Sequence, residues 1–220
     1  MFYYYGRKKK IAHLYPDPKH EKIIEPFCGS AAYSLHGDRW KKEVILYDTN
    51  PVVIDIWKYL LQASIKDIEK LPDLKKGDDT RKIEWLSREE RLLMGFAINP
   101  GSRRTCYLVS NYSRWSANKK YIAENIHKIK HWKVFMRDYT SSGNQTATWF
   151  IDPPYLKMGV HYVKTGLDYN KLKEWILERK GQVIACEGVD ADYLPFEPIA
   201  EVVAIGKRIS KEYVYIKEDE

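Results

Sequence analysis

Apolar and polar positions along the chain follow two kinds of spacing, one typical of strands and one typical of helices. The apolar runs at residues 22–25 and 43–47 are short and are followed by Pro and Asp, as buried strands often are. After the second run, Asn50 and Pro51 fit the N-cap and first position of a helix, and residues 52–64 carry apolar side chains at helical spacing. This order predicts a βαβ unit and therefore a parallel sheet.

The rest of the framework extends this pattern. Residues 27–37 contain glycine and are expected to form a tight turn that enters a helix. Further strands are expected at residues 133–136, 149–151 and 182–186, with an amphipathic helix over residues 167–181 that Gly181 closes and a β-hairpin over residues 197–217 that turns near Gly206. The predicted fold class is α/β, with a doubly wound mixed sheet and a C-terminal β-hairpin.

The middle of the chain differs from this framework. Ser87 and Glu90 have the spacing of a capping box and predict a helix start, and a second helix is expected to begin near Ser116 and continue to residue 132. A basic, aromatic loop lies between the two helices. We therefore expect one domain formed by residues 1–74 and 132–220, with residues 75–131 as a small, mostly helical insertion.

Composition narrows the class of protein. The chain has 220 residues, of which 44% are hydrophobic and 30% are charged, which suits a globular domain with an insertion. It has no apolar run of about 18 residues, as a membrane span would require, and its aromatic-then-basic start is the reverse of a secretory signal. Cys28, Cys106 and Cys186 are too far apart in the sequence to indicate a zinc knuckle or a disulfide framework, which favours a cytoplasmic setting. The net charge of +7 favours polyanionic partners.

Acidic residues follow three of the expected strands, at Asp48, Asp138 and Asp152. In open α/β sheets, ligands bind beyond the carboxyl ends of the strands. Asp48 lies about twenty residues beyond the Gly29 turn, the spacing at which an acid reaches ribose hydroxyls. Each acid taken alone could be a helix N-cap or a solvated surface group. The three together with the glycine turn favour a ligand that contains a nucleoside.

Four motifs in order give the sequence a resemblance to a known family. They are Tyr5-Gly6-Arg7-Lys8, Glu25-Pro26-Phe27-Cys28-Gly29-Ser30, Asp48-Thr49-Asn50-Pro51 and Asp152-Pro153-Pro154-Tyr155. This set resembles the Dam-type, D12 class DNA adenine N6-methyltransferases, which use S-adenosylmethionine. The resemblance covers about residues 2–60 and 120–216 and implies a Rossmann-like methyltransferase fold. Arg7 and Ala31 depart from it, because each stands where the family usually has glycine.

The resemblance implies roles for these residues. The S-adenosylmethionine site would comprise Tyr4, Tyr5, Gly6, Lys8, Phe27, Cys28, Gly29, Ser30, Asp48, Asp138 and Asp152. Asp48 would bind the ribose hydroxyls and Asp138 the cofactor adenine, while Lys8 and Tyr4 would hold the methionine end or enclose the cofactor. Lys8 could instead be a phosphate contact, and Tyr4 could be part of the core.

The catalytic residues implied by the resemblance are Asp152, Pro153, Pro154 and Tyr155. The exocyclic nitrogen of adenine is a poor nucleophile, because its lone pair is delocalised into the ring. A carboxylate and a proline carbonyl can accept its two N–H bonds and direct the lone pair at the methyl group, so that catalysis is mostly positioning and electrostatics. Tyr155 would offer a face to an adenine flipped out of the duplex.

The basic, aromatic part of the insertion is expected to contact DNA. The candidates are Arg103, Arg104, Arg114, Trp115, Lys119 and Lys120, interleaved with Tyr107 and Tyr112. Trp115 could act as a wedge that fills the gap left by a flipped base. The alternative is a solvated loop whose aromatic residues belong to the core. Because the segment is short, it predicts a short or degenerate recognition site.

No metal is expected, since methyl transfer from a sulfonium needs none. His127 and His131 are four residues apart on an expected helix, but without a third ligand a basic helix face is the favoured interpretation. Competing functions are an RNA or protein amide methyltransferase of the same fold and a catalytically idle nucleic-acid-binding protein. A nicotinamide dehydrogenase would leave Asp152–Tyr155 unexplained and lacks its full glycine motif. We expect double-stranded DNA as partner, a monomer or weak dimer, and the cytoplasm of a prokaryotic or phage-infected cell.

Overall fold

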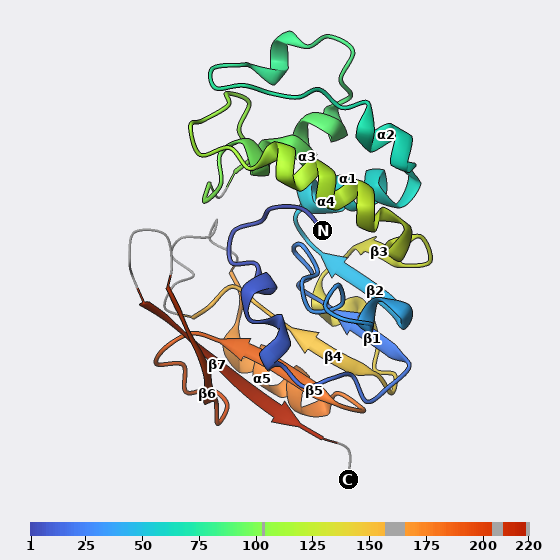
Figure 1. The fold of residues 1–220 in the computed structure, drawn as a ribbon. Coiled ribbons are helices and arrows are strands. Elements are labelled where there is room, and N and C mark those ends of the chain that lie inside the picture. The colour runs from blue at the N-terminus through green and yellow to red at the C-terminus, as the bar shows by residue number, and fades with distance from the viewer. Residues whose placement is uncertain (103, 157–165, 204–208, 219–220) are drawn as a thin grey trace.

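The computed structural model describes residues 1–102, 104–156, 166–203 and 209–218. Its centre is a seven-stranded mixed sheet with the strand order β3-β2-β1-β4-β5-β7-β6 (Figure 1). The strands are β1 (Lys22–Glu25), β2 (Glu43–Asp48), β3 (Lys133–Met136), β4 (Thr148–Ile151), β5 (Val183–Glu187), β6 (Glu197–Val203) and β7 (Ile209–Lys217). The first five run parallel, and β7 is antiparallel to both β5 and β6. This order confirms the expected mixed sheet of Rossmann-like type and the C-terminal hairpin.

Helices cover both faces of this sheet. Figure 1 shows α1 (Pro51–Gln62), α2 (Ile65–Glu69), α3 (Arg88–Ile98) and α4 (Trp115–Asn125) gathered in one group, with α5 (Tyr169–Glu178) on the other side of the strands. Adjacent residues of one strand enter different cores, since side chains alternate between the faces. Ile23 packs with Trp57 of α1, whereas Ile24 packs with Trp175 of α5. Burial on both faces explains the continuous apolar runs of β2, β4 and β5, whereas the edge strand β3 is mostly exposed.

The local signals for helices are confirmed at the starts of α1 and α3. The Asn50 side chain accepts a hydrogen bond from the Val52 amide, and Pro51 occupies the first turn. Ser87 and Glu90 form the reciprocal capping box that the sequence predicts. Both α3 and α4 contribute to the same hydrophobic core as α1, so the insertion is packed directly on the framework. The division at residues 75 and 131 stays a prediction.

Three expectations about helices are wrong. Residues 29–38 form successive turns rather than a helix, because Gly29 (φ 44°) and Ala31 (φ 48°) adopt left-handed backbone conformations. The second helix of the insertion begins at Trp115 and ends at Asn125, where a 3-10 turn over Ile126–Ile129 replaces it. Arg179 rather than Gly181 is the C-cap of α5. The expected hairpin turn at Gly206 lies outside the described residues.

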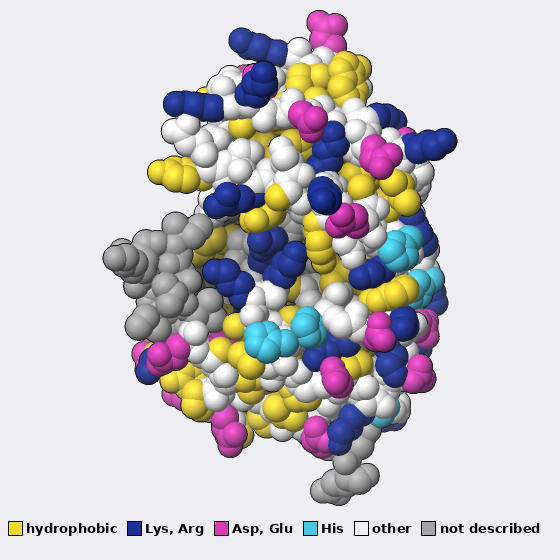
Figure 2. All heavy atoms as spheres, viewed as in Figure 1, with side chains coloured by type: hydrophobic (Ala, Val, Ile, Leu, Met, Phe, Trp, Pro, Cys, Tyr) yellow, Lys and Arg dark blue, Asp and Glu magenta, His cyan; other side chains and the backbone are white. Residues whose placement is uncertain are grey.

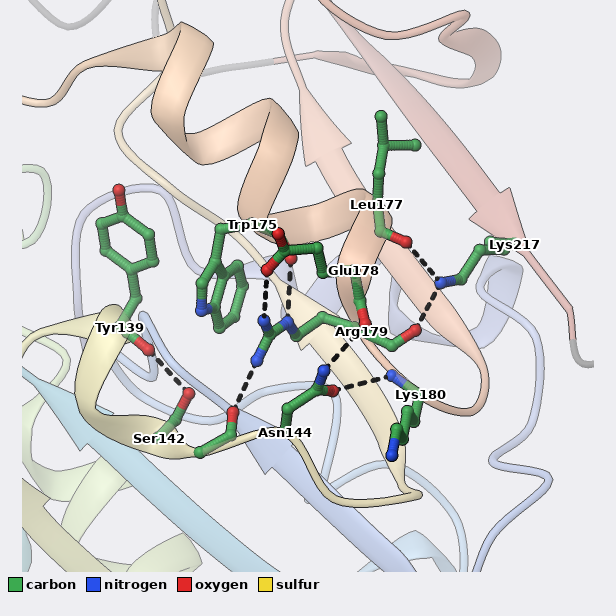
Figure 3. Close-up of polar contacts among 10 residues, drawn as sticks. Tyr139, Ser142, Asn144, Trp175, Leu177, Glu178, Arg179, Lys180 and Lys217 are labelled. Carbon is green, nitrogen blue, oxygen red and sulfur yellow. Dashed lines mark hydrogen bonds and ion pairs between the residues drawn. The ribbon is translucent and has the colours of Figure 1, made fainter.

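A polar network closes the amino edge of the sheet, where α5 ends and β4 begins (Figure 3). The buried Arg179 guanidinium donates hydrogen bonds to the carbonyls of Trp175 (2.8 Å) and Gly143 (2.5 Å). Asn144 joins the same loop to the carbonyl of Glu178 (2.9 Å) and the amide of Lys180 (3.0 Å). These bonds satisfy carbonyl groups at the end of α5 and fix the loop that leads into β4.

No helix among the residues that the structure describes is long and apolar enough to cross a membrane.

Gly181 is required by close packing rather than by a helix cap. A Cβ at this position would lie 2.2 Å from the Ala147 carbonyl oxygen, and the residue has φ 93°. We expect Gly181→Ala to lower the free energy of unfolding by about 3 kcal/mol, from a clash and a left-handed backbone together. Gly77→Ala is the matched control, because Gly77 has φ 86° but nothing within 4 Å of the added Cβ. Equal losses for the two variants in urea unfolding would contradict this explanation.

Candidate active site at the carboxyl edge of the sheet

The parallel strands β1 and β4 are neighbours at the centre of the sheet, and their carboxyl ends lie side by side. Between them lies the point at which the chain changes from adding strands on one side to adding them on the other. From β1 the chain crosses to β2 and β3 on one side, and then returns to β4 and β5 on the other. In open α/β sheets this switch point opens the crevice in which ligands bind. The Gly29 turn follows β1 and the Asp152–Tyr155 turn follows β4, so the fold brings these two predicted motifs to the switch point.

Asp48 ties the turn after β1 to the turn after β2. Its Oδ2 atom accepts a hydrogen bond from the Gly29 amide (3.0 Å), and its Oδ1 atom accepts one from the Asn50 amide (2.9 Å). Burial raises the pKa of Asp48, while these backbone N–H groups oppose the rise. The Trp57 indole donates to the Gly29 carbonyl (2.8 Å), which fixes the same turn from α1.

Aromatic side chains lie on both sides of this turn. Tyr4 covers Gly29 so closely that a Cβ there would be 3.0 Å from its ring. Phe27 stacks on Tyr139, with ring centroids 5.4 Å apart. Tyr4 also packs edge-on against Phe96 of the core. The N-terminal segment, which Figure 1 shows passing between the helical group and the sheet, therefore lies against the turn after β1.

Lys8 is buried against Asp152. The ammonium lies 2.8 Å from Asp152 Oδ1, 3.4 Å from a carboxylate oxygen of Glu212 and 4.6 Å from the ring centroid of Tyr155. Burial alone would lower the pKa of Lys8, but the two carboxylates outweigh it and raise the pKa above its ordinary value. Lys8 is therefore a fixed cation beside the acid that the sequence analysis places at the centre of catalysis.

Glu212 is a site residue that the sequence analysis missed. It lies on β7, is buried, and accepts hydrogen bonds from the hydroxyls of Tyr155 and Tyr15, the latter at 2.9 Å. Burial raises its pKa, and Lys8 opposes the rise. In the sequence, Glu212 is one acid within the predicted hairpin. No neighbouring residue indicates that its side chain points into the protein.

Single atoms of Asp152, Cys186 and Glu212 lie within 4.8 Å of one another, a spacing that a metal ion could use. The Lys8 ammonium contacts two of these three groups and supplies a positive charge there. The arrangement is therefore an ion-paired cluster around Lys8.

Glu187, at the end of β5, holds the turn after β4. Its carboxylate accepts hydrogen bonds from the amides of Leu156 (3.2 Å) and Gly188 (2.8 Å) and from the Tyr193 hydroxyl (3.1 Å). Burial raises the pKa of Glu187 to about 7. The ring of Tyr155 rests on Gly188, where a Cβ would come within 2.9 Å of it. Glu187 and Gly188 therefore both hold the turn from β5 and the residue after it.

The carbonyls of Pro153 and Pro154 differ in whether they accept a hydrogen bond. The Tyr169 hydroxyl donates a hydrogen bond to the Pro154 carbonyl. No described residue donates to the carbonyl of Pro153. Pro153 is buried and lies two residues beyond the end of β4.

Glu25 is a further buried acid at this edge, besides Glu212 and Glu187. It closes β1, and its carboxylate accepts hydrogen bonds from the amide (3.0 Å) and hydroxyl (2.5 Å) of Ser34. Burial raises its pKa to about 7, although both bonds to Ser34 oppose the rise.

Asp138 lies apart from this buried cluster, on the surface. It caps a 3-10 turn by accepting hydrogen bonds from the Thr140 amide (2.9 Å) and hydroxyl (2.8 Å). This is the N-cap that the sequence analysis weighed as the alternative, and a cofactor contact at Asp138 stays a prediction. Apart from Asp48 and Asp152, the other predicted cofactor residues lie on two segments. Phe27, Cys28, Gly29 and Ser30 are on the turn after β1, and Tyr4, Tyr5, Gly6 and Lys8 are on the N-terminal segment.

The wedge role of Trp115 is wrong. The side chain is 1% exposed, and its indole nitrogen donates to the Pro72 carbonyl at 2.8 Å. Trp115 starts α4 as a core residue and cannot enter DNA without unfolding the insertion. Tyr112, three residues earlier, is 75% exposed.

The predicted DNA-binding cations differ in how exposed they are. Lys119 is largely engaged within the protein, because its ammonium contacts the Leu71 carbonyl (2.5 Å) and Asp73 (3.1 Å). Arg104, Arg114 and Lys120 are exposed, and Arg103 lies outside the described residues.

His127 and His131 do not share one helix, since α4 ends before them. Both rings lie beside Trp40, with centroids 6.0 Å and 6.5 Å from it. The His131 Nε2 atom is 3.1 Å from the Lys42 carbonyl oxygen. The two residues therefore pack around Trp40.

Comparison with family models gives one match, over part of the chain. The family model described as D12 class N6 adenine-specific DNA methyltransferase matches residues 4–89, which confirms the resemblance seen in the motifs. This match supports methyl transfer as the class of reaction and, with it, a methyl-donor cofactor. None of the curated proteins matches the sequence.

Solved structures give a weaker likeness. The chain is similar to a conserved hypothetical protein of Streptococcus pyogenes, with 9% identity, a TM-score of 0.40 and coverage of 90% of this chain and 86% of that one. It is also similar to the rRNA methyltransferase aviRa from Streptomyces viridochromogenes, with 14% identity, a TM-score of 0.41 and coverage of 89% and 76%. With such TM-scores, neither structure bears on the reaction.

The pKa of Glu25 predicts a pH dependence of stability. Its value is about 7 in the folded protein against an ordinary 4.5, so between these values the folded state holds a proton that the unfolded chain has lost. The free energy of unfolding should therefore fall as the pH rises from about 4.5 through 7, by on the order of 3 kcal/mol from this group. Glu25→Gln keeps an acceptor for Ser34 but does not titrate, and should flatten that fall. An unchanged pH profile of urea unfolding would contradict the assignment, and Ser34→Ala controls for loss of the hydrogen bonds alone.

Proposed function

We propose that this protein transfers a methyl group from S-adenosylmethionine to the N6 amino group of adenine in DNA. The chain resembles the D12 class of adenine-specific DNA methyltransferases over residues 4–89. One observation carries the proposal further. Asp152, at the carboxyl end of β4 and outside that matched range, lies at the sheet's switch point with a buried Lys8 against one of its oxygens.

The residues after β1 and β2 suit the cofactor. The Oδ2 atom of Asp48 accepts from the Gly29 amide and, at 3.9 Å, from the Cys28 thiol, while its Oδ1 atom accepts from the Asn50 amide and keeps an acceptor position. A carboxylate oxygen accepts about two hydrogen bonds, so ribose hydroxyls can still be bound there. Glycine at position 29 allows the Tyr4 ring to lie against the turn, because a side chain at this position would meet that ring. S-adenosylmethionine would supply an electrophilic methyl group, and Asp48 with the turn over residues 27–30 would hold it.

Asp152 and Pro153 would bind the amino group of the target adenine. Because Lys8 occupies Oδ1 of Asp152, the Oδ2 atom is left to accept one N–H of the base. The Pro154 carbonyl already accepts from Tyr169, so the Pro153 carbonyl would accept the second N–H. Two acceptors fixed in this way restrain the amino group and direct its lone pair, which favours attack without any movement of the protein.

Tyr155 would form one side of the pocket for the flipped base. Glu212 holds its hydroxyl, and Gly188 and Lys8 lie against its ring. A rigid ring offers contact area at low entropic cost. The restraint supports a role in positioning the extruded adenine beside Asp152.

The exposed part of the insertion would contact the DNA. Arg104, Arg114 and Lys120 can reach phosphates, and Tyr112 offers an exposed ring close to Arg114 in the sequence. These few groups can read few base edges, so the recognition site should be short or degenerate.

The direct test is to incubate the protein with S-adenosylmethionine and unmodified double-stranded DNA, and to identify the methylated nucleoside by mass spectrometry. N6-methyladenine in DNA supports the proposal. Methylated RNA or protein with unmodified DNA would replace it with another methyltransferase activity, and no product on any substrate would favour a nucleic-acid-binding role.

Asp152 should matter most for the chemical step. We expect Asp152→Ala to slow single-turnover methylation by about 100-fold or more, because one preorganised contact to the reacting group is commonly worth that much. Cofactor affinity should weaken but remain measurable. Asp152→Asn keeps one acceptor oxygen and should lose less than the alanine variant. A loss of only a few-fold for Asp152→Ala, in protein that is still folded at the assay temperature, would remove Asp152 from this role.

Asp48 should matter for the cofactor instead. Charge-assisted hydrogen bonds contribute about 1.5–3 kcal/mol each, so Asp48→Asn should weaken S-adenosylmethionine binding about tenfold or more. Asp55→Asn is the matched control, since Asp55 lies on the next helix and pairs with Arg88. Calorimetry on both variants tests the assignment. Equal cofactor affinities would show that Asp48 serves only to join the two turns.

A further inference from the structure

The short 3-10 helix over Lys8–Lys10 sends its basic side chains in different directions. Lys8 points inward to Asp152. Arg7 and Lys9, on either side of it, line a separate cavity of about 130 Å³ together with Ser30, His36 and Tyr121. The cavity lies between the turn after β1 and helix α4. Arg7 and Lys9 are the sequence neighbours of Lys8, which contacts Asp152.

Aromatic rings hold both of these cations in place. The Arg7 guanidinium lies 3.6 Å from the ring centroid of Tyr3, and the Lys9 ammonium lies 3.6 Å from that of Tyr121. A ring face orients a cation by its quadrupole but leaves its charge uncompensated. The two side chains are thus positioned without being neutralised.

No carboxylate of the described residues pairs with either cation. Neighbouring cations behave differently, since Lys8 pairs with Asp152 and Arg39 pairs with Asp17 at 2.9 Å. The residues that line the cavity include no Asp or Glu. Burial lowers the pKa of Lys9, and the charge of Arg7 lowers it further, so the two cations repel each other where they stand. An anion bound between them would relieve this repulsion.

The surface around the site is consistent with an anionic ligand. Figure 2 shows Lys and Arg side chains gathered in a hollow between the upper and lower parts of the face in view, while Asp and Glu lie mostly around it. Such an arrangement attracts polyanions and concentrates the field within the hollow.

We propose that Arg7 and Lys9 bind a backbone phosphate of the nucleic acid, close to the target nucleotide. The identity of the ligand rests on the proposed function. Phosphate contacts fix the register of a protein on its substrate. Because Arg7 and Lys9 flank Lys8 in one turn of helix, a phosphate held in this cavity would set the position of the strand relative to Asp152. The arginine that departs from the family's usual glycine thereby acquires a function.

The test is the salt dependence of duplex binding by Arg7→Gln/Lys9→Gln. Loss of one phosphate contact should reduce the slope of log affinity against log salt by about 1, and the affinity at low salt about tenfold or more. Lys70→Gln/Lys171→Gln is the matched control, because it removes the same charge from lysines paired with Asp67 and Asp168. The control should keep the wild-type slope. Arg7→Lys/Lys9→Arg keeps both charges and should also keep the wild-type slope. It therefore tests the role of the charges if the glutamine variant folds poorly.

A single neutral methylphosphonate, moved along the DNA strand, locates the contact. The wild type should lose affinity at one position near the target adenine, and the glutamine variant should lose nothing further there. Equal losses at every position in both proteins would overturn the proposal. So would an unchanged slope with weaker S-adenosylmethionine binding, because the cavity would then hold the cofactor carboxylate.

These binding measurements need no methyl transfer. DNA binding through Arg7 and Lys9 without methylation would refute the proposed function and leave this site standing. Methylation with an unaffected salt slope would refute this site alone, and absence of nucleic-acid binding by the wild type would refute both.

Discussion

The burial of Lys8 is the interaction on which the site depends. An isolated ammonium inside a protein would cost several kcal/mol in lost hydration, so it needs carboxylates close by. Asp152 and Glu212 provide them, one from the turn after β4 and one from β7. The Tyr15 hydroxyl joins the same cluster through Glu212. One buried charge therefore holds the N-terminal segment, the parallel part of the sheet and the antiparallel hairpin together, and removing it would leave two acids uncompensated.

This constraint explains how the Asp152–Tyr155 turn is held in place. Lys8 fixes one oxygen of Asp152, Glu212 fixes the Tyr155 hydroxyl, and Glu187 accepts hydrogen bonds from backbone amides just beyond. Burial also makes some acids at this edge harder to ionise, since it raises the pKa of Glu187 to about 7 and raises the pKa of Glu212. These contacts join the charged groups of the site to one another, an arrangement that suits electrostatic positioning of a weak nucleophile.

The sequence by itself determined the elements whose causes are local. The N-cap at Asn50, the capping box at Ser87 and the buried strands were all predicted, because hydrogen bonds between near neighbours and apolar spacing decide them. The order of the motifs placed Asp48 and Asp152 at strand ends, and the parallel sheet then brought those ends to one edge. A family resemblance could be recognised for the same reason, since short motifs carry it.

Only the tertiary structure decided which side chains face one another. Trp115 looked like a DNA contact because it stands among basic residues, but Pro72 and the core enclose it. Glu212 carried no signal, because its partners are about 57 and 197 residues away in the chain. Gly181 was mistaken for a helix cap, whereas the nearby Ala147 carbonyl requires it. In each case the deciding contact joins segments distant in sequence, and local patterns cannot show which surfaces packing will bury.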